Sequence, residues 1–362
     1  MAILNLTMLG GVLVNLWVKV INFLNNSIGN YAWAIILLTV VIKLAMSPLD
    51  FFNKKTSRKN AVMQAKIQPE LQKLQAKYGN DKNLYNQKVN ELYKKENYNV
   101  VGSCLFMFVN LALTCVVFFS LLSGINTMAS NKIVGQYETL KSTYNTTYQT
   151  SIDQGKTVEE AKEISNQAVE EKYQQVKYSW LWIDNVWKSD MPTNSIPTFS
   201  EYLKVAQEVK VGDEYVSVKK LSQEQKTALE SEYNVVMGPL RENVGKANGY
   251  LILLVLTVGS AFLSQWLAQR KTKVQGAPTN KITMFILPIM LGVFALTYNS
   301  VFALYMLASQ LITIALNPLI DFILDKMEAK KEQKKELAKA EAVPYRRVDP
   351  NVKTKQNKKG DK

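Results

Sequence analysis

The segment Asn30–Asp50, NYAWAIILLTVVIKLAMSPLD, contains the decisive pattern of this sequence. Tyr31–Leu49 is almost wholly apolar and approaches the ~20 residues that a helix needs to cross the hydrocarbon core of a bilayer. A single lysine, Lys43, interrupts the run and precedes Pro48 by five residues. The segment therefore predicts a membrane-spanning helix with one charged side chain inside it.

Four further segments of the 362-residue chain share this apolar character: Cys104–Leu122, Gly249–Ala268, Thr283–Tyr298 and Ser300–Ile320. The fourth of the five predicted spans contains Pro288, which a helix bundle in a membrane tolerates. Asn299–Ser300 predicts a tight turn before the fifth. We therefore expect an all-α polytopic membrane protein with five spanning helices, of which 30–122 supplies two and 249–320 supplies three.

Residues 1–29 predict an amphipathic helix ahead of the first span. Its polar residues share one helical stripe: Asn15, Lys19, Asn22 and Asn26. Trp17 and Phe23 fall on the apolar side, and such a helix lies in the membrane interface. The alternative is an uncleaved signal anchor, but Met1–Leu13 lacks the charged region with which a signal sequence usually begins. Ser27–Asn30 predicts the break before the first span.

The distribution of charge predicts the orientation. The chain carries 44 lysines and arginines against 30 acids, a formal net charge of +14. The basic residues concentrate between spans one and two, between spans three and four, and after Ile320, whereas Ser123–Asn248 contains slightly more acids than bases. Because lysine and arginine favour the cytoplasmic side, five spans place the N-terminus outside and the tail in the cytoplasm of a bacterial plasma membrane.

The segments between the spans carry their own patterns. Asn53–Asn97 predicts a cytoplasmic helical hairpin with a turn at Gly79–Asp81, and Pro69 suits the first turn of a restarted helix. In the outer region 123–248, Val158–Tyr173 predicts a helix and Lys210–Lys219 a small β hairpin. Residues 321–362 predict a helix extension followed by a disordered basic tail.

A tryptophan-rich cluster in the outer region predicts a segment docked on the outer membrane interface. Its expected anchors are Trp180, Trp182 and Trp187. The alternative is that these side chains belong to the core of a soluble fold.

Lys43 is the candidate functional residue inside the membrane. A charge at the centre of a span costs roughly 2.5–3.5 kcal/mol on insertion scales, so such a residue usually faces a polar interior. Small polar groups on three spans could accompany it in a hydrated cavity: Thr39, Asn110, Thr114, Ser309, Gln310 and Thr313. The alternative is that the Lys43 side chain extends along the helix to the cytoplasmic head groups.

The residue types exclude most enzyme classes. The chain has no histidine, which removes the usual general base and most zinc and haem sites. Its two cysteines, Cys104 and Cys115, would lie well over ~10 Å apart on one helix, too far for a disulfide. We therefore expect no catalytic residue, no metal and no cofactor.

Four blocks of the sequence resemble the YidC/Oxa/Alb family of membrane protein insertases: Asn30–Asp50, Gln64–Leu121, Trp180–Pro192 and Lys281–Thr313. The resemblance implies a groove that is open to cytoplasm and lipid and closed outside, where a buried cation attracts polar or acidic parts of a substrate. Lys43 stands where the family typically has arginine, and lysine keeps the charge but loses the fork of donors. Asn110 stands where glutamine is common.

The resemblance also implies partners. These are nascent membrane proteins, a Sec translocon, anionic lipids and, through a basic tail similar to ones that bind ribosomes, ribosomal RNA. The tail residues expected to make that contact are Arg346, Arg347, Lys358 and Lys359. The alternative function is a secondary transporter or ion pathway that uses Lys43 as a counter-ion. A scaffold whose outer region binds cell-wall components is a third hypothesis.

Overall fold

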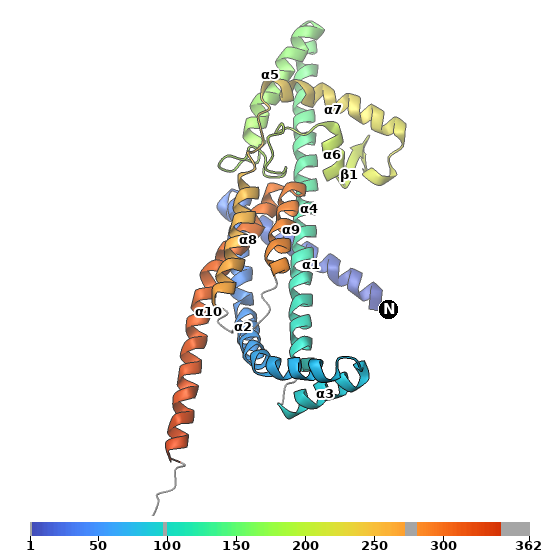
Figure 1. The fold of residues 1–362 in the computed structure, drawn as a ribbon. Helices are drawn as coiled ribbons and strands as arrows, with labels where there is room; N and C mark the ends of the chain where they lie inside the picture. The colour runs from blue at the N-terminus through green and yellow to red at the C-terminus, as the bar shows by residue number, and fades with distance from the viewer. Residues whose placement is uncertain (1, 97–99, 272–280, 342–362) are drawn as a thin grey trace, which may run out of the picture. The chain divides into compact units, whose positions relative to one another are not determined.

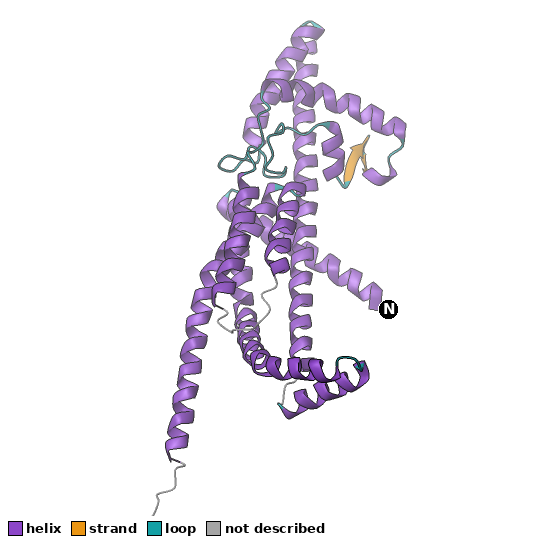
Figure 2. Ribbon diagram, viewed as in Figure 1, coloured by secondary structure: helices purple, strands orange, loops and turns teal. Residues whose placement is uncertain are grey.

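The structure is a computed structural model, and it describes residues 2–96, 100–271 and 281–341. The described chain is mostly helical, with a single small sheet (Figures 1 and 2). The α-helices are α1 (Ala2–Ile28), α2 (Tyr31–Tyr78), α3 (Lys82–Lys95), α4 (Val100–Asp153), α5 (Val158–Val176), α6 (Phe199–Val205), α7 (Gln223–Asn243), α8 (Ile252–Lys271), α9 (Lys281–Thr297) and α10 (Ser300–Glu341). The strands are β1 (Glu208–Val211) and β2 (Glu214–Ser217), followed by a short 3-10 helix, Val218–Lys220. The helical fold class is thus confirmed.

The chain divides into two compact units, Met1–Leu316 and Asn317–Lys362. The second unit begins within α10 and is helical as far as Glu341. The expected ribosome contacts of the tail, Arg346, Arg347, Lys358 and Lys359, lie outside the described residues.

Three helical segments within the described ranges are long and apolar enough to cross a membrane: Tyr31–Tyr78, Phe108–Asp153 and Ser300–Ala338. They contain the first and fifth predicted spans and overlap the second from Phe108 onward. The third and fourth correspond to shorter apolar helices, Ile252–Leu267 and Pro288–Thr297. These two helices, α8 and α9, pack closely, because a Cβ added at Gly292 would lie 2.9 Å from Cγ2 of Val258.

The break between α1 and α2 lies where the sequence predicts it. Helix α1 ends at Ile28, Gly29 adopts a positive φ of 80°, and the Asn30 side chain accepts hydrogen bonds from the first amides of α2. Helix α1 packs on α4, and the Trp17 indole nitrogen donates to Ser120 Oγ at 2.9 Å. Phe23 stays exposed on another face of the helix.

Helix α2 is longer than the sequence predicts, because neither Pro48 nor Pro69 interrupts it. The expectation that Pro69 begins a new helix is therefore wrong. A proline leaves the carbonyl four residues earlier without its amide donor. For Pro48 that carbonyl is on Leu44, and the Ser47 hydroxyl donates to it at 2.8 Å. The helix therefore continues through the proline.

The end of α2 and α3 form a helical hairpin. The chain turns at Gly79 and Asn80, and the Asp81 carboxylate caps the first amides of α3. Ile67 and Leu92 are the buried side chains of this pair, and Lys66 forms an ion pair with Glu96.

Helix α4 does not end with the second predicted span but continues for another thirty-one residues to Asp153. Its extension packs against α5, α6 and α7 and provides the base of the outer region. The core of this region contains three tyrosine rings, Tyr137, Tyr202 and Tyr233, with centroids 4.9–5.4 Å apart. The predicted β hairpin is present as β1 and β2, which pair antiparallel across a turn containing Gly212.

Candidate functional site

Lys43 lies on α2 immediately after Ile42, the last buried residue of the apolar part of that helix. Its side chain is half-buried. Asp50 lies two turns further along the helix, and its carboxylate attracts the Lys43 ammonium group. The predicted site therefore includes a counter-charge that the sequence interpretation did not include.

The threonines of the predicted site satisfy their hydroxyl groups within their own helices. Thr39 is fully buried and donates to the Ile35 carbonyl at 2.6 Å. Thr114 donates to the Asn110 carbonyl at 2.9 Å, and Thr313 donates to the Ser309 carbonyl at 2.7 Å. Each of these hydroxyl groups already has a backbone carbonyl as acceptor for its proton. The threonines therefore add mild polarity at little desolvation cost.

The three long apolar helices are packed at one end and open at the other. On α2, buried side chains stop at Ile42 and resume only in the hairpin, at Ile67. On α4, no side chain described before Leu121 is buried. On α10, burial stops at Ala308 for the remainder of the first unit. Since α4 runs antiparallel to the other two, the packed ends of all three helices coincide.

The predicted polar residues lie at the boundary of this packed end. Lys43 follows the last buried residue of α2, and Ser309 follows the last on α10. Gln310 and Asn110 are half-buried in the open part, while Thr114 is exposed there. Thr313 is half-buried on α10, and only Thr39 lies inside the packed part. The structure thus places six of the seven predicted residues on the open halves of three neighbouring helices.

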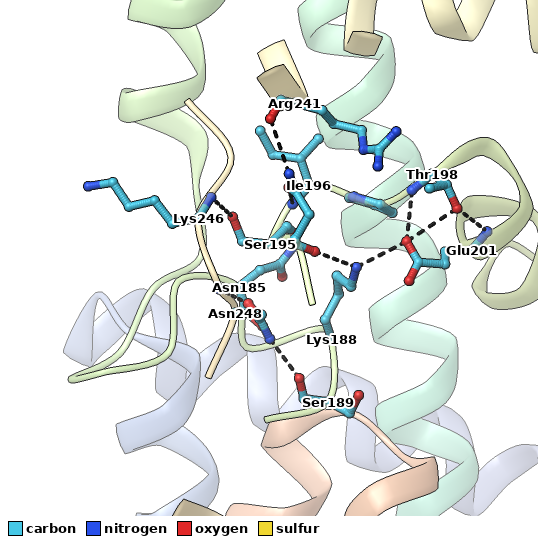
Figure 3. Close-up of polar contacts among 12 residues, drawn as sticks. Asn185, Lys188, Ser189, Ser195, Ile196, Thr198, Glu201, Arg241, Lys246 and Asn248 are labelled. Atoms are coloured by element: carbon cyan, nitrogen blue, oxygen red, sulfur yellow. Dashed lines mark hydrogen bonds and ion pairs between the residues drawn. The ribbon is translucent and has the colours of Figure 1, made fainter. Parts of the chain in front are cut away.

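The packed end is held by what we call the outer junction, defined as Asn185–Asn194 together with Asn248 and Ser300. Asn248 Oδ1 accepts from the Asn185 amide at 2.7 Å, and Asn248 Nδ2 donates to the carbonyls of Asn185 and Ser189 (Figure 3). The Asp190 carboxylate accepts from the Tyr250 and Leu253 amides at 2.9 and 2.6 Å, at the start of α8. This cap stabilises the N-terminal end of a predicted span.

The outer junction also fixes the beginning of α10 and contacts α6. Ser300 donates to the Lys188 carbonyl through both its amide, at 2.8 Å, and its hydroxyl, at 2.7 Å. The Lys188 ammonium group donates to the Asn194 carbonyl at 2.6 Å and to Glu201 at 3.1 Å (Figure 3). Burial lowers the pKa of Lys188, and the Glu201 carboxylate partly opposes that effect. Burial disfavours ionised Glu201, but hydrogen bonds from Thr198 and the charge of Lys188 outweigh it and lower the pKa of Glu201.

The three tryptophans predicted as interface anchors occupy different environments. Trp187 is fully buried against Tyr31 and Tyr178, with ring centroids 5.1 and 6.1 Å away. Trp180 and Trp182 are half-buried and lie 5.7 Å apart. Trp180 also contacts Trp33 on the first turn of α2, at 5.6 Å. Contact with a membrane surface stays a prediction for this cluster, and Trp187 itself packs inside the protein.

Two leucines beside the tryptophans have unusual backbone conformations. Leu181 has φ 47° and Leu251 has φ 61°, the only positive φ values among the described residues other than glycine. A left-handed conformation costs an L-residue about 1–2 kcal/mol. The Leu181 side chain is 70% exposed at the tip of the turn between Trp180 and Ile183. Burying a leucine in an apolar phase gains about 1.5–3 kcal/mol, enough to offset that strain.

Two hollows adjoin the segment that contains Lys177 and Ser179. The first, of about 410 Å³, lies against the α1–α2 break and is also lined by Asn30 and Tyr31. The second, of about 250 Å³, is lined by Trp182, Asp184, Lys246 and Tyr250, among others. Neither contains a predicted substrate-site residue. Among the described residues, no group of three or more His, Cys, Asp or Glu side chains could hold a metal ion.

The sequence interpretation omitted Lys188, Asp190 and Asn248 of the outer junction, and it omitted Asp50. Lys188, Asp190 and Asn248 bond to chain segments that are distant in sequence, so no local pattern identifies them. Asp50 had a signal, because a residue seven positions after Lys43 returns to the same helical face.

Comparisons with known proteins give one family. The family model of the 60Kd inner membrane protein matches residues 23–328. Among curated relatives, the "Membrane protein insertase YidC" of Thioalkalivibrio sulfidiphilus is 36% identical over 106 residues, which cover 29% of this chain and 18% of that protein. The protein of the same name from Fusobacterium nucleatum is 36% identical over 29% of this chain and 49% of its own length. That of Nitratidesulfovibrio vulgaris is 40% identical over 30% of this chain and 19% of its own length. The matched part thus spans less than half of each of these relatives.

Proposed function

This chain belongs to the 60Kd inner membrane protein family, and from that membership we propose that it is a membrane protein insertase. The family match confirms the resemblance to the YidC/Oxa/Alb insertases. The observation that supports the activity in this chain is the helix bundle, packed at one end and open at the other, with Lys43 at the boundary. The transporter hypothesis is not favoured by these relatives.

In the proposed mechanism, the open halves of α2, α4 and α10 form a polar groove that a substrate enters from the cytoplasm. Lys43 attracts acidic or polar side chains of the segment to be translocated, while the hydrophobic segment moves sideways into lipid. The groove lowers the barrier because a polar segment need not cross the full ~30 Å of hydrocarbon unsolvated. No covalent bond is made or broken.

The outer junction closes one end of the helix bundle, so a substrate can enter the proposed groove only from the other end. It ties the starts of α8 and α10 to the outer region, so the packed end opposes passage of water and ions. We propose that this end faces outside and that the hairpin of α2 and α3 faces the cytoplasm, which agrees with the basic charge of the hairpin. All five apolar helices then span the membrane, and α1 lies in the outer interface.

Partners follow from the same proposal. The substrates are nascent membrane proteins, and the basic tail binds ribosomal RNA or anionic lipid. A Sec translocon is the expected neighbour when a substrate has large translocated domains.

The activity is tested by depletion of the native insertase in a bacterial host that expresses this chain. Wild type should restore insertion of a short single-span substrate, measured by protease accessibility of its translocated end. Failure to restore insertion by a correctly localised chain would refute the proposed activity.

The role of Lys43 is tested separately with a substrate whose translocated segment carries acids. Lys43→Arg should retain insertion, Lys43→Gln should reduce it, and Lys43→Glu should reduce it further through like-charge repulsion. A substrate with an uncharged segment serves as the control and should respond less. Equal insertion by all variants would show that the charge is not used and that the side chain extends to the head groups.

A further inference from the structure

The hollow of about 250 Å³ beside the outer junction combines features that point to a ligand. Lys177 and Lys246 provide two positive charges, against the single carboxylate of Asp184, which lies 3.9 Å from Lys177. The ammonium group of Lys246 has no carboxylate partner among the described residues, and its side chain is exposed. The hollow therefore keeps a net positive charge and suits an anion.

The rim of the same hollow is apolar. Leu181 and Tyr250 are 70% and 64% exposed, and Trp182 also lines the hollow. Leu181, which has a positive φ of 47°, belongs to this rim. Strained backbone that presents an exposed apolar side chain requires compensation from a surrounding phase. An apolar rim around a basic hollow matches a molecule with a charged head and a hydrocarbon chain.

The position of the hollow agrees with a membrane boundary. Tyr250 and Leu251 immediately precede α8, an apolar helix that begins at Ile252. Trp182 contacts Trp180, which contacts Trp33 on the first turn of α2. The hollow therefore lies level with the first turns of two apolar helices, where tyrosine and tryptophan favour the head-group layer.

We propose that this hollow binds the head group of an anionic phospholipid in the outer leaflet, with Lys177 and Lys246 contacting the phosphate and Leu181 inserted among the acyl chains. The proposal rests on the proposed function only for the membrane location and orientation of the chain. It differs from the lipid contact expected of the basic tail, because it uses other residues, Lys177 and Lys246. A bound lipid here would hold the Trp180–Ile183 turn against the membrane and stabilise the outer junction beneath it.

The test uses the full chain in vesicles that contain equal amounts of phosphatidylglycerol and phosphatidylcholine. A photo-reactive benzoylphenylalanine replaces Leu181, and mass spectrometry measures the ratio of the two crosslinked lipids. The two lysines attract the anionic head group and Asp184 removes part of that attraction, so the expected enrichment of phosphatidylglycerol over phosphatidylcholine is about tenfold. Lys177→Gln/Lys246→Gln should abolish this enrichment.

Matched controls separate the site from general charge. Lys219→Gln/Lys220→Gln removes the same charge from an exposed part of the outer region and should leave the enrichment intact. Lys177→Arg/Lys246→Arg retains the charge and should also retain it, which excludes a folding defect as the cause of loss. Inorganic phosphate, added against chloride at matched ionic strength, should not lower the ratio.

Several outcomes would overturn the proposal. These are equal crosslinking of the two lipids by the wild-type site, an unchanged ratio in the glutamine variant, equal loss in the Lys219/Lys220 control, and displacement by inorganic phosphate, which would identify a site for small anions. Absence of any lipid crosslink would show that the turn does not meet the membrane. The substrate-insertion assay is independent of this readout, so failure of the insertase proposal and failure of the lipid site are distinguishable.

Discussion

The ion pair in the outer junction yields the sharpest stability prediction. The Lys188 side chain is 9% exposed, and its ammonium group holds the Asn194 carbonyl and the Glu201 carboxylate. Lys188→Met keeps the aliphatic stem but removes the donor of the Asn194 carbonyl and the positive charge beside Glu201, whose carboxylate keeps its hydrogen bonds from Thr198. Removing one member of a buried pair costs about 3–5 kcal/mol, and we expect about 3 kcal/mol here because Glu201 is 38% exposed and water screens it.

Hydrogen exchange of the full chain in lipid nanodiscs measures this cost as the opening free energy of residues 185–201. A loss of about 3 kcal/mol corresponds to at least a hundredfold increase in the opening constant. Glu201→Gln should cost about 1 kcal/mol, since glutamine can still cap α6 and only the charge is lost. The double variant should cost less than the sum of the two, because the pair is then absent from both sides.

The structural reasoning would be refuted if Lys188→Met changed the opening free energy by less than about 0.5 kcal/mol, the range of ordinary surface substitutions. Additive costs in the double variant would show instead that Lys188 acts through the Asn194 carbonyl alone. Exchange in the hairpin of α2 and α3 provides the internal control, because it shares no contact with this pair.

Three further predictions concern other parts of the chain. Asp50→Asn should increase insertion of a substrate with an acidic segment, because the Asp50 carboxylate competes with the substrate's acids for Lys43. At about 10.5 Å along the helix and an effective dielectric constant of ~20, its attraction for Lys43 is about 1.6 kcal/mol. An equal change in yield for substrates with acidic and uncharged segments would contradict this. Gly124→Val should weaken the packing of α1 on α4 by about 1–3 kcal/mol, since even a Cβ at this position would lie 3.0 Å from a side-chain carbon of α1; Gly135→Ala, which meets nothing within 4 Å, should instead be neutral or stabilising in the same thermal unfolding assay. The pKa of Glu201 is below its ordinary value of 4.5, so the ionised carboxylate should contribute its full stability above pH 4.5 and lose it as the pH falls below that value. Glu201→Gln should flatten this acid-induced loss. Hydrogen exchange between pH 3 and 6, about 1.5 units on either side of the ordinary pKa, measures it.

The sequence was most informative where one helix carries its own pattern. Apolar runs predicted the helices, Ser27–Asn30 predicted the break at Gly29, and Gly79–Asp81 predicted the hairpin turn. The chemistry of a local motif also misled, because Pro69 reads as a helix start yet lies inside α2. Helix continuity there depends on neighbouring side chains and packing, which a single proline does not reveal.

The candidate site was predictable in its membership but not in its surroundings. Polar residues at helical spacing identified Lys43 and its companions, since a polar group in an apolar run stands out. The boundary of burial on which they lie requires three helices in register, and the outer junction requires Asn185 to meet Asn248 across sixty-three positions. The role of a residue in such a junction depends on a hydrogen-bond partner that is distant in sequence, and local periodicity does not predict that partner.

Helix α4 has a mechanical consequence. It is one unbroken helix from Val100 to Asp153, about 81 Å long at 1.5 Å per residue. Helix α1 packs against it near the middle, where Trp17 lies against Gly124. A rod held near its midpoint behaves as a lever with a fulcrum. A tilt of about 5° would swing its far tip by about 4 Å over the roughly 44 Å beyond Gly124, in the opposite sense to its near end. A displacement at the end of α4 next to the hairpin of α2 and α3 thus moves the end of α4 near Asp153 without any relay of side-chain contacts.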